Sequence, residues 1–198
     1  MRMPLQYPLQ LSFKLVALAP QVYVRDAQGT IVAYIRQKLL RLKESVTVFG
    51  DERQTNPLYH INADRIIDFS ARYRITDARS AEVGSVKRRG MRSLWRAHYD
   101  ICENDRPTMT IREENPWVRL VDGVIGDLPL LGWFSGYMLN PTYLVSRADG
   151  TVVLRLRKRP AFLESRFVVE RVATLSEDDE RRALLSLMMF LLLERSRG

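Results

Sequence analysis

Short stretches in which apolar and polar residues alternate recur along most of the chain. The clearest spans residues 95–102, where Trp95, Ala97, Tyr99 and Ile101 alternate with more polar neighbours. A period of two predicts a strand with one buried face. Comparable stretches are predicted as strands at 11–18, 21–25, 31–38, 45–49, 58–62, 71–76, 82–87, 108–112, 117–121, 143–146, 152–157 and 167–171. About a dozen short strands with turn signals between them are typical of an antiparallel sandwich or barrel.

One apolar run near the C-terminus has no such alternation. Residues 183–193 read ALLSLMMFLLL, which has high helix propensity and contains no Gly, Pro or β-branched residue. Ser176 and Asp179 predict a capping pair at the helix start, with acidic residues in the first turn. The run is too short to span a bilayer and has charged residues close on both sides. Because it has no polar face, the helix is expected to be surrounded by protein.

A barrel that closes around this helix accounts for both observations. A helix with its side chains is roughly 10–12 Å across, and barrels of about eleven strands are known to enclose one. We therefore predict a mainly β protein: a closed antiparallel barrel of about twelve strands around a central hydrophobic C-terminal helix. The length of 198 residues fits a single domain over residues 1–198.

Three predicted hairpins, at residues 23–38, 73–90 and 143–160, share a pattern. Each starts with Tyr, has an Asp near the turn and a Gly, and ends in basic residues. The Asp and Gly positions are turn chemistry. The pattern fits an internal duplication, and it also fits the general similarity of hairpins.

The basic ends of these hairpins are the candidate binding surface. Arg36 and Lys38 alternate, as do Lys87 and Arg89, so each set projects from one face of its strand. If the hairpins are equivalent, the clusters gather toward one rim or one flank, where they would suit phosphate groups. The alternative is that these basic residues form a solvated outer face that only maintains solubility. The candidate residues for headgroup phosphate are Lys38, Lys43, Lys87, Arg88, Arg89, Arg155, Arg157 and Lys158.

Composition supports an anionic partner and gives no sign of catalysis. Lys and Arg total 31 against 23 Asp and Glu, a net charge of +8. The chain has no phosphate-binding glycine loop, no paired metal ligands and no nucleophile beside a base, so we expect no enzyme, no metal and no cofactor. One cysteine, Cys102, excludes an internal disulfide and favours a cytoplasmic protein. The basic surface would place such a protein in peripheral contact with a membrane. Nucleic-acid binding is not favoured, because the basic residues are spread over many strands without a recognition module.

A second interpretation assigns the protein a scaffold role. Residues 127–141, read as DLPLLGWFSGYMLNP, are apolar, aromatic and rich in Gly without clear periodicity. This segment would pack on the barrel, contact a membrane interface, or bind a protein partner.

Several stretches resemble the LURP-one-related family. They are YVRDAQGTIVAYIRQKLLRLKESVTVFGDE from Tyr23, INADRIIDFSARYRITD from Ile61, GSVKRRGMRSLWRAHYDI from Gly84, and the apolar C-terminal helix. The chain is similar to bacterial members of this family, which belongs with the tubby C-terminal-like and phospholipid scramblase proteins. The resemblance implies a twelve-stranded barrel around a hydrophobic helix, and phosphoinositide binding by surface Lys and Arg as in tubby proteins. The chain lacks a calcium-binding spacing and a cysteine cluster for acylation, so the resemblance does not extend to calcium-driven scrambling.

Overall fold

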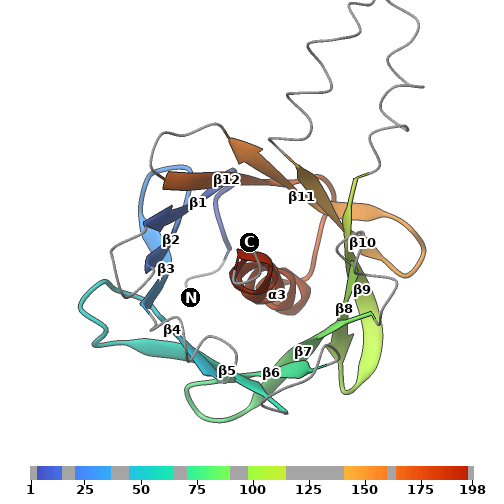
Figure 1. The fold of residues 1–198 in the computed structure, drawn as a ribbon, viewed down its shortest axis with the longest axis horizontal. Helices are drawn as coiled ribbons and strands as arrows, with labels where there is room; N and C mark the ends of the chain where they lie inside the picture. Colours follow the sequence, from blue (N-terminus) through green and yellow to red (C-terminus); the bar gives the residue numbers. More distant parts are fainter. Residues whose placement is uncertain are drawn as a thin grey trace, which may run out of the picture.

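Twelve antiparallel strands form a closed barrel with one helix inside it, as predicted (Figure 1). The computed structural model describes residues 4–14, 21–36, 45–64, 71–89, 98–114, 141–159 and 164–195. The strands are β1 (Leu9–Lys14), β2 (Gln21–Arg25), β3 (Ile31–Arg36), β4 (Ser45–Phe49), β5 (Pro57–Ala63), β6 (Arg72–Asp77), β7 (Glu82–Arg88), β8 (His98–Glu103), β9 (Arg106–Glu113), β10 (Thr142–Arg147), β11 (Val152–Arg159) and β12 (Glu164–Arg171).

Each strand pairs with the next along the chain, and the barrel closes where β1 pairs with β12. At this closure Leu9 lies opposite Val169 and Leu11 lies opposite Phe167. Strand boundaries differ from expectation by a few residues; β1 begins before the predicted 11–18, and β12 begins before 167 because it pairs along the whole of β1. The predicted strand at 117–121 lies outside the described residues.

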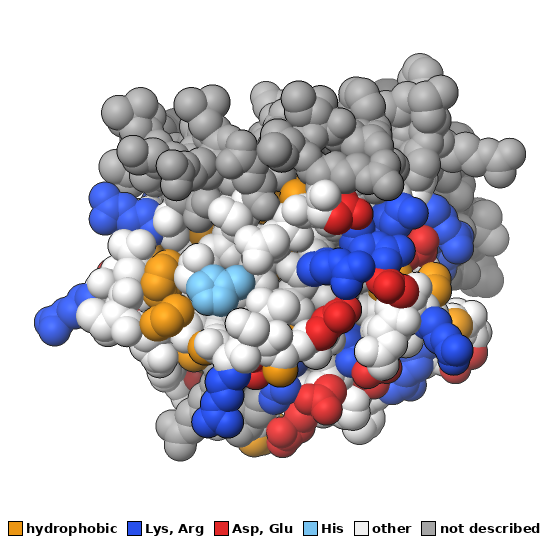
Figure 2. Space-filling model, turned by 90° about the horizontal axis from the view of Figure 1, so that it is seen from below, with side chains coloured by type: hydrophobic (Ala, Val, Ile, Leu, Met, Phe, Trp, Pro, Cys, Tyr) orange, Lys and Arg blue, Asp and Glu red, His pale blue; other side chains and the backbone are white. Residues whose placement is uncertain are grey.

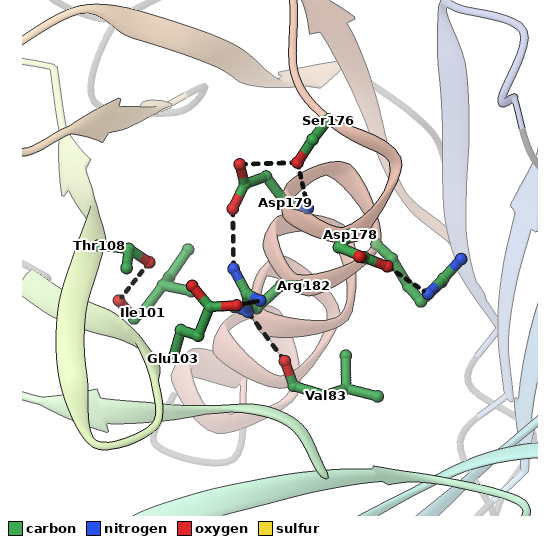
Figure 3. A network of polar contacts seen from close by, with 9 residues as sticks. Val83, Ile101, Glu103, Thr108, Ser176, Asp178, Asp179 and Arg182 are labelled. Carbon is green, nitrogen blue, oxygen red and sulfur yellow. Dashed lines mark hydrogen bonds and ion pairs between the residues drawn. The ribbon is translucent and has the colours of Figure 1, made fainter. Parts of the chain in front are cut away.

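Helix α3 (Glu177–Arg195) fills the barrel. At its start the Asp179 backbone N–H donates to Ser176 Oγ over 3.1 Å, and Ser176 Oγ donates to the Asp179 carboxylate over 2.8 Å (Figure 3). This is the predicted capping pair. Every residue from Ala183 to Leu193 is at most 8% exposed, so the helix is buried on all sides as its composition required.

The alternating direction of the strands gives the barrel two different ends. One end, here called the turn rim, is formed by the connections 26–30, 50–56, 78–81, 104–105, 148–151 and 172–176. The other, here called the basic rim, holds the last residues of odd-numbered strands and the first residues of even-numbered strands. Helix α3 starts at the turn rim and runs toward the basic rim, where Tyr99 Oη donates to the Glu194 carboxylate over 2.7 Å.

Candidate anion-binding rim

The three hairpins singled out in the sequence are β2–β3, β6–β7 and β10–β11, and their turns have the same geometry. In each, the N–H of the fourth turn residue donates to the carbonyl of the first: Gly29 to Asp26, Ser80 to Asp77, and Gly150 to Arg147. Each fourth residue has a positive φ, of 82°, 66° and 89° respectively. A register shift also precedes each turn at the corresponding place. The hairpins are therefore structural repeats placed four strands apart.

The shared tyrosines are not equivalent, which corrects the sequence pattern. Tyr73 and Tyr143 stand four residues before the turn and face the barrel interior, where Tyr143 packs against Phe190. Tyr23 stands three residues before its turn and pairs across strands with Tyr34 on the outer face. One residue of offset reverses the direction of a strand side chain.

The basic residues at the ends of these hairpins are equivalent. Arg36, Lys87 and Arg157 each lie ten residues after the first turn residue, and each pairs with the first residue of the partner strand. All three strands run in the same direction, so the three cations lie at one rim. They do not share one flank, because three strands lie between each and the next around the barrel.

Charge is separated along the barrel axis. The terminal two residues of each strand at the basic rim include two acids, Glu113 and Glu164, and a larger set of cations. These cations are Lys14, Arg36, Arg72, Lys87, Arg88, Arg112, Lys158 and Arg159.

The turn rim has the opposite balance. The terminal two residues of its strands hold equal numbers of cations (Arg25, Arg106, Arg147 and Arg171) and acids (Asp77, Glu82, Glu103 and Glu170). Its connections and the first helical turn add two cations, Arg53 and Arg79, and a larger set of acids. These acids are Asp26, Asp51, Glu52, Asp105, Asp149, Glu177, Asp178, Asp179 and Glu180. The carboxylates of Asp26, Asp51 and Asp149 accept backbone N–H groups of their own turns. These hydrogen bonds lower the pKa of Asp51 and of Asp149, which keeps both carboxylates charged.

Part of the outward charge is paired within the barrel wall. One pair joins the two sets just described, because Arg72 of the basic rim binds the Asp105 carboxylate of the turn rim. Arg157 lies 3.7 Å from a Glu170 carboxylate oxygen, and Arg89 Nε lies 3.2 Å from Asp100 Oδ2. On the side of the barrel that Figure 2 shows, blue and red side chains also lie close together in part of the face. A carboxylate this close offsets part of the positive charge of its partner, so the unpaired cations of the rim carry most of its positive field.

Two of the predicted binding residues face inward. Arg88 follows Val86 on the interior face of β7 and is 7% exposed, and Lys158 lies opposite Phe167 on the interior face of β11. Both are near the C-terminal end of α3, where cations complement the helix dipole. Arg88 and Lys158 are therefore not part of the outer surface formed by Lys87, Arg89, Arg155 and Arg157. Arg88 stands two residues after Val86, and Lys158 stands two residues after Leu156. This spacing predicts that both side chains face the interior.

Three other expectations concern parts of the chain that the structure does not describe. Lys38 and Lys43 lie in 37–44, which connects β3 and β4 between their basic-rim ends. Of the apolar segment 127–141, only Pro141 is described.

The surroundings of His98 and Cys102 shift the pKa of each side chain. His98 is on the outer face of β8, where burial and the nearby charge of Arg89 lower its pKa. Cys102 is 3% exposed, and burial raises its pKa. Within the described ranges, no group of three His, Cys, Asp or Glu is placed to hold a metal ion.

The described surface has a hollow at each end of the barrel. A cavity of about 530 Å³ at the turn rim lies between residues 4–6 and the connections of β2–β3 and β4–β5. Its acid, Asp26, is already bonded to the N–H groups of Gln28 and Thr30. A smaller cavity of about 180 Å³ at the basic rim is lined by Lys158 and by the end of α3. In the part of the chain that the structure describes, no helix is both long enough and apolar enough to cross a bilayer.

A solved structure and a family model are similar to this chain. The chain is similar over its fold to an Arabidopsis thaliana protein solved by X-ray crystallography, with 13% identity and a TM-score of 0.48, covering 96% of this chain and 92% of that one. A search of curated proteins gave no match. The sequence model of the LURP-one-related family matches residues 31–122, from the first residue of β3 to a point beyond β9.

Proposed function

We propose that this protein is a non-enzymatic barrel that binds anionic surfaces, foremost phospholipid headgroups, through the basic rim. The observation that carries the proposal is the separation of charge along the barrel axis, with Arg36, Lys87 and Arg157 at equivalent outward positions. Such a charge dipole would orient the basic rim toward a negatively charged membrane.

Arginine suits this role because its planar guanidinium binds phosphate oxygens in pairs. The outward cations lie on β1, β3, β6, β7, β9 and β11, so an anionic surface at this end would face cations from several strands. A kinship with tubby and scramblase proteins, and a place at the cytoplasmic face of a membrane, belong to this proposal.

The test is co-sedimentation of the full chain with vesicles of phosphatidylcholine alone or mixed with phosphatidylserine, at low and at physiological salt. The proposal expects binding only to the anionic vesicles, weakened by salt. Each basic residue near such a surface contributes about 1 kcal/mol. The triple variant Arg36→Glu, Lys87→Glu and Arg157→Glu should therefore bind at least about a hundredfold more weakly.

A matched control places the same charge change at the opposite end. Arg53, Arg79 and Arg106 are exposed at the turn rim, and their replacement by Glu alters net charge equally. The control should retain much more vesicle binding than the basic-rim variant. Equal loss in both would show that net charge alone is responsible, and no binding to any vesicle would overturn the proposal.

A further inference from the structure

The cavity of about 180 Å³ at the basic rim is lined in large part by apolar side chains. Phe13 and Phe167 meet edge to face, with ring centroids 5.7 Å apart. The ring of Tyr143 packs against that of Phe190, with centroids 4.8 Å apart, and Leu191 of α3 also lines the cavity. Apolar cavities of about 150 Å³ in proteins stay dry and take up a benzene-sized molecule. This cavity is therefore large enough for roughly six to eight carbon atoms.

The polar groups of the cavity favour a single negative charge. Lys158 faces inward opposite Phe167, and makes no ion pair with any described residue. Ser165 lies two residues before Phe167 on the same face of β12, opposite Phe13, and its hydroxyl is a second donor. The carboxylate of Glu194 accepts a hydrogen bond from Tyr99 Oη, and its negative charge repels a dianion such as a phosphate monoester more strongly than a monoanion.

From these contacts we infer that the cavity binds a medium-chain carboxylate, with its head on Lys158 and Ser165 and its chain against Phe13, Tyr143, Phe167 and Leu191. The ammonium of Lys158 donates a charge-assisted hydrogen bond to the carboxylate. The apolar side chains that line the cavity bind water poorly, so the hydrocarbon chain of the ligand displaces only weakly held water. This site uses inward-facing residues and is separate from the outward cations proposed to bind headgroups.

Isothermal titration of the full chain with butanoate, hexanoate and octanoate tests the inference. Burial of each added methylene should tighten binding by about fourfold until the cavity is full. Hexanol, which lacks the negative head, should bind at least tenfold more weakly than hexanoate. Ser165→Leu fills the cavity and should abolish binding, while thermal unfolding checks that the variant is folded.

Two adjacent residues of β11 give a matched pair of variants. Lys158→Gln removes the inward charge and should weaken octanoate binding at least tenfold. Arg157→Gln removes the same charge from the outer face and should change it less than twofold. Equal weakening by both variants, affinity independent of chain length, or no saturable octanoate binding would each overturn the inference. Vesicle binding by Lys158→Gln is measured in parallel, and its retention separates this site from the headgroup surface.

Discussion

The side chain of Arg182 lies directly against the backbone of Gly84, so the helix touches the barrel wall without an intervening side chain. A β-carbon at Gly84 would stand 2.8 Å from Arg182 Cδ and 2.6 Å from the Cys102 carbonyl oxygen. From this position Arg182 Nε donates to the Val83 carbonyl over 2.8 Å, and its terminal nitrogens reach Asp179 and Glu103 (Figure 3). Two residues far apart in sequence thus fix the depth of the helix in the barrel.

Gly84→Ala is expected to destabilise the fold by about 2–4 kcal/mol, because overpacking adds to backbone strain at a φ of 152°. Gly29→Ala is the control, since its added β-carbon meets nothing within 4 Å and only the positive φ is strained. That variant should lose about 1–2 kcal/mol. Denaturant unfolding measures both, and equal losses would contradict the close contact with Arg182.

Arg182→Met should lower the free energy of unfolding by about 2–3 kcal/mol, because hydrogen bonds to charged partners and to the Val83 carbonyl are lost. Arg182 is 3% exposed, whereas its neighbour Arg181 pairs with a largely exposed Asp178. Arg181→Met should therefore cost less than about 1 kcal/mol. A comparable loss from both substitutions, measured by chemical denaturation, would show that Arg182 does not anchor the helix.

Two serines of the helix region should respond to alanine with opposite signs. Ser186 is fully buried, and its hydroxyl has no hydrogen-bond partner among the described atoms. Ser186→Ala should stabilise the protein by up to about 1 kcal/mol, because it removes an unsatisfied buried polar group. Ser176→Ala removes the N-cap and should destabilise it by about 1 kcal/mol. The melting temperature of each variant tests both expectations, and destabilisation by Ser186→Ala would contradict the prediction.

The thiol of Cys102 should react slowly with a disulfide reagent in the folded protein and rapidly after unfolding. Burial limits access to the sulfur and raises its pKa, so little thiolate forms at neutral pH. Absorbance of the released reagent group gives both rates. Fast reaction of the native protein would place Cys102 at an accessible position.

Stability should fall as the pH is lowered from 7.5 toward 5.5, in part through His98. Its pKa is lower in the folded state than in the unfolded chain, so the unfolded state binds more protons in this range. The contribution is present above about pH 6.5 and is lost as the pH falls through the folded pKa. His98→Gln should reduce the difference in unfolding free energy between the two pH values. An unchanged difference would assign the pH dependence to other groups.

Much of the architecture followed from local patterns. Alternation at Tyr99 and Ile101 predicted an inward face for β8, and both residues are buried in the core. The run from Ala183 to Leu193 required protein on every side, and closure of the barrel supplies it. Each of these inferences depends on the periodicity of side-chain direction, which the sequence carries directly.

The candidate site was predicted less completely. Arg36 and Lys87 are equivalent because their hairpins share a turn geometry and register. An alignment on Tyr23 and Tyr73 would shift the two hairpins by one residue. The distance between cationic clusters around the barrel depends on strand order, and sequence spacing alone does not give it. Arg88 and Lys158 adjoin outward cations in the sequence but face inward, because side-chain direction reverses at each residue of a strand.

The sequence by itself determined the strands, the buried helix and the basic strand ends, because these follow from the period of two and from helix propensity. Only the tertiary structure decided that the odd-numbered strands end at one rim, that the acids of the turns gather at the other, and that Lys158 and Glu194 line one cavity. These relations join residues far apart along the chain. They arise when β1 pairs with β12 and closes the barrel around α3.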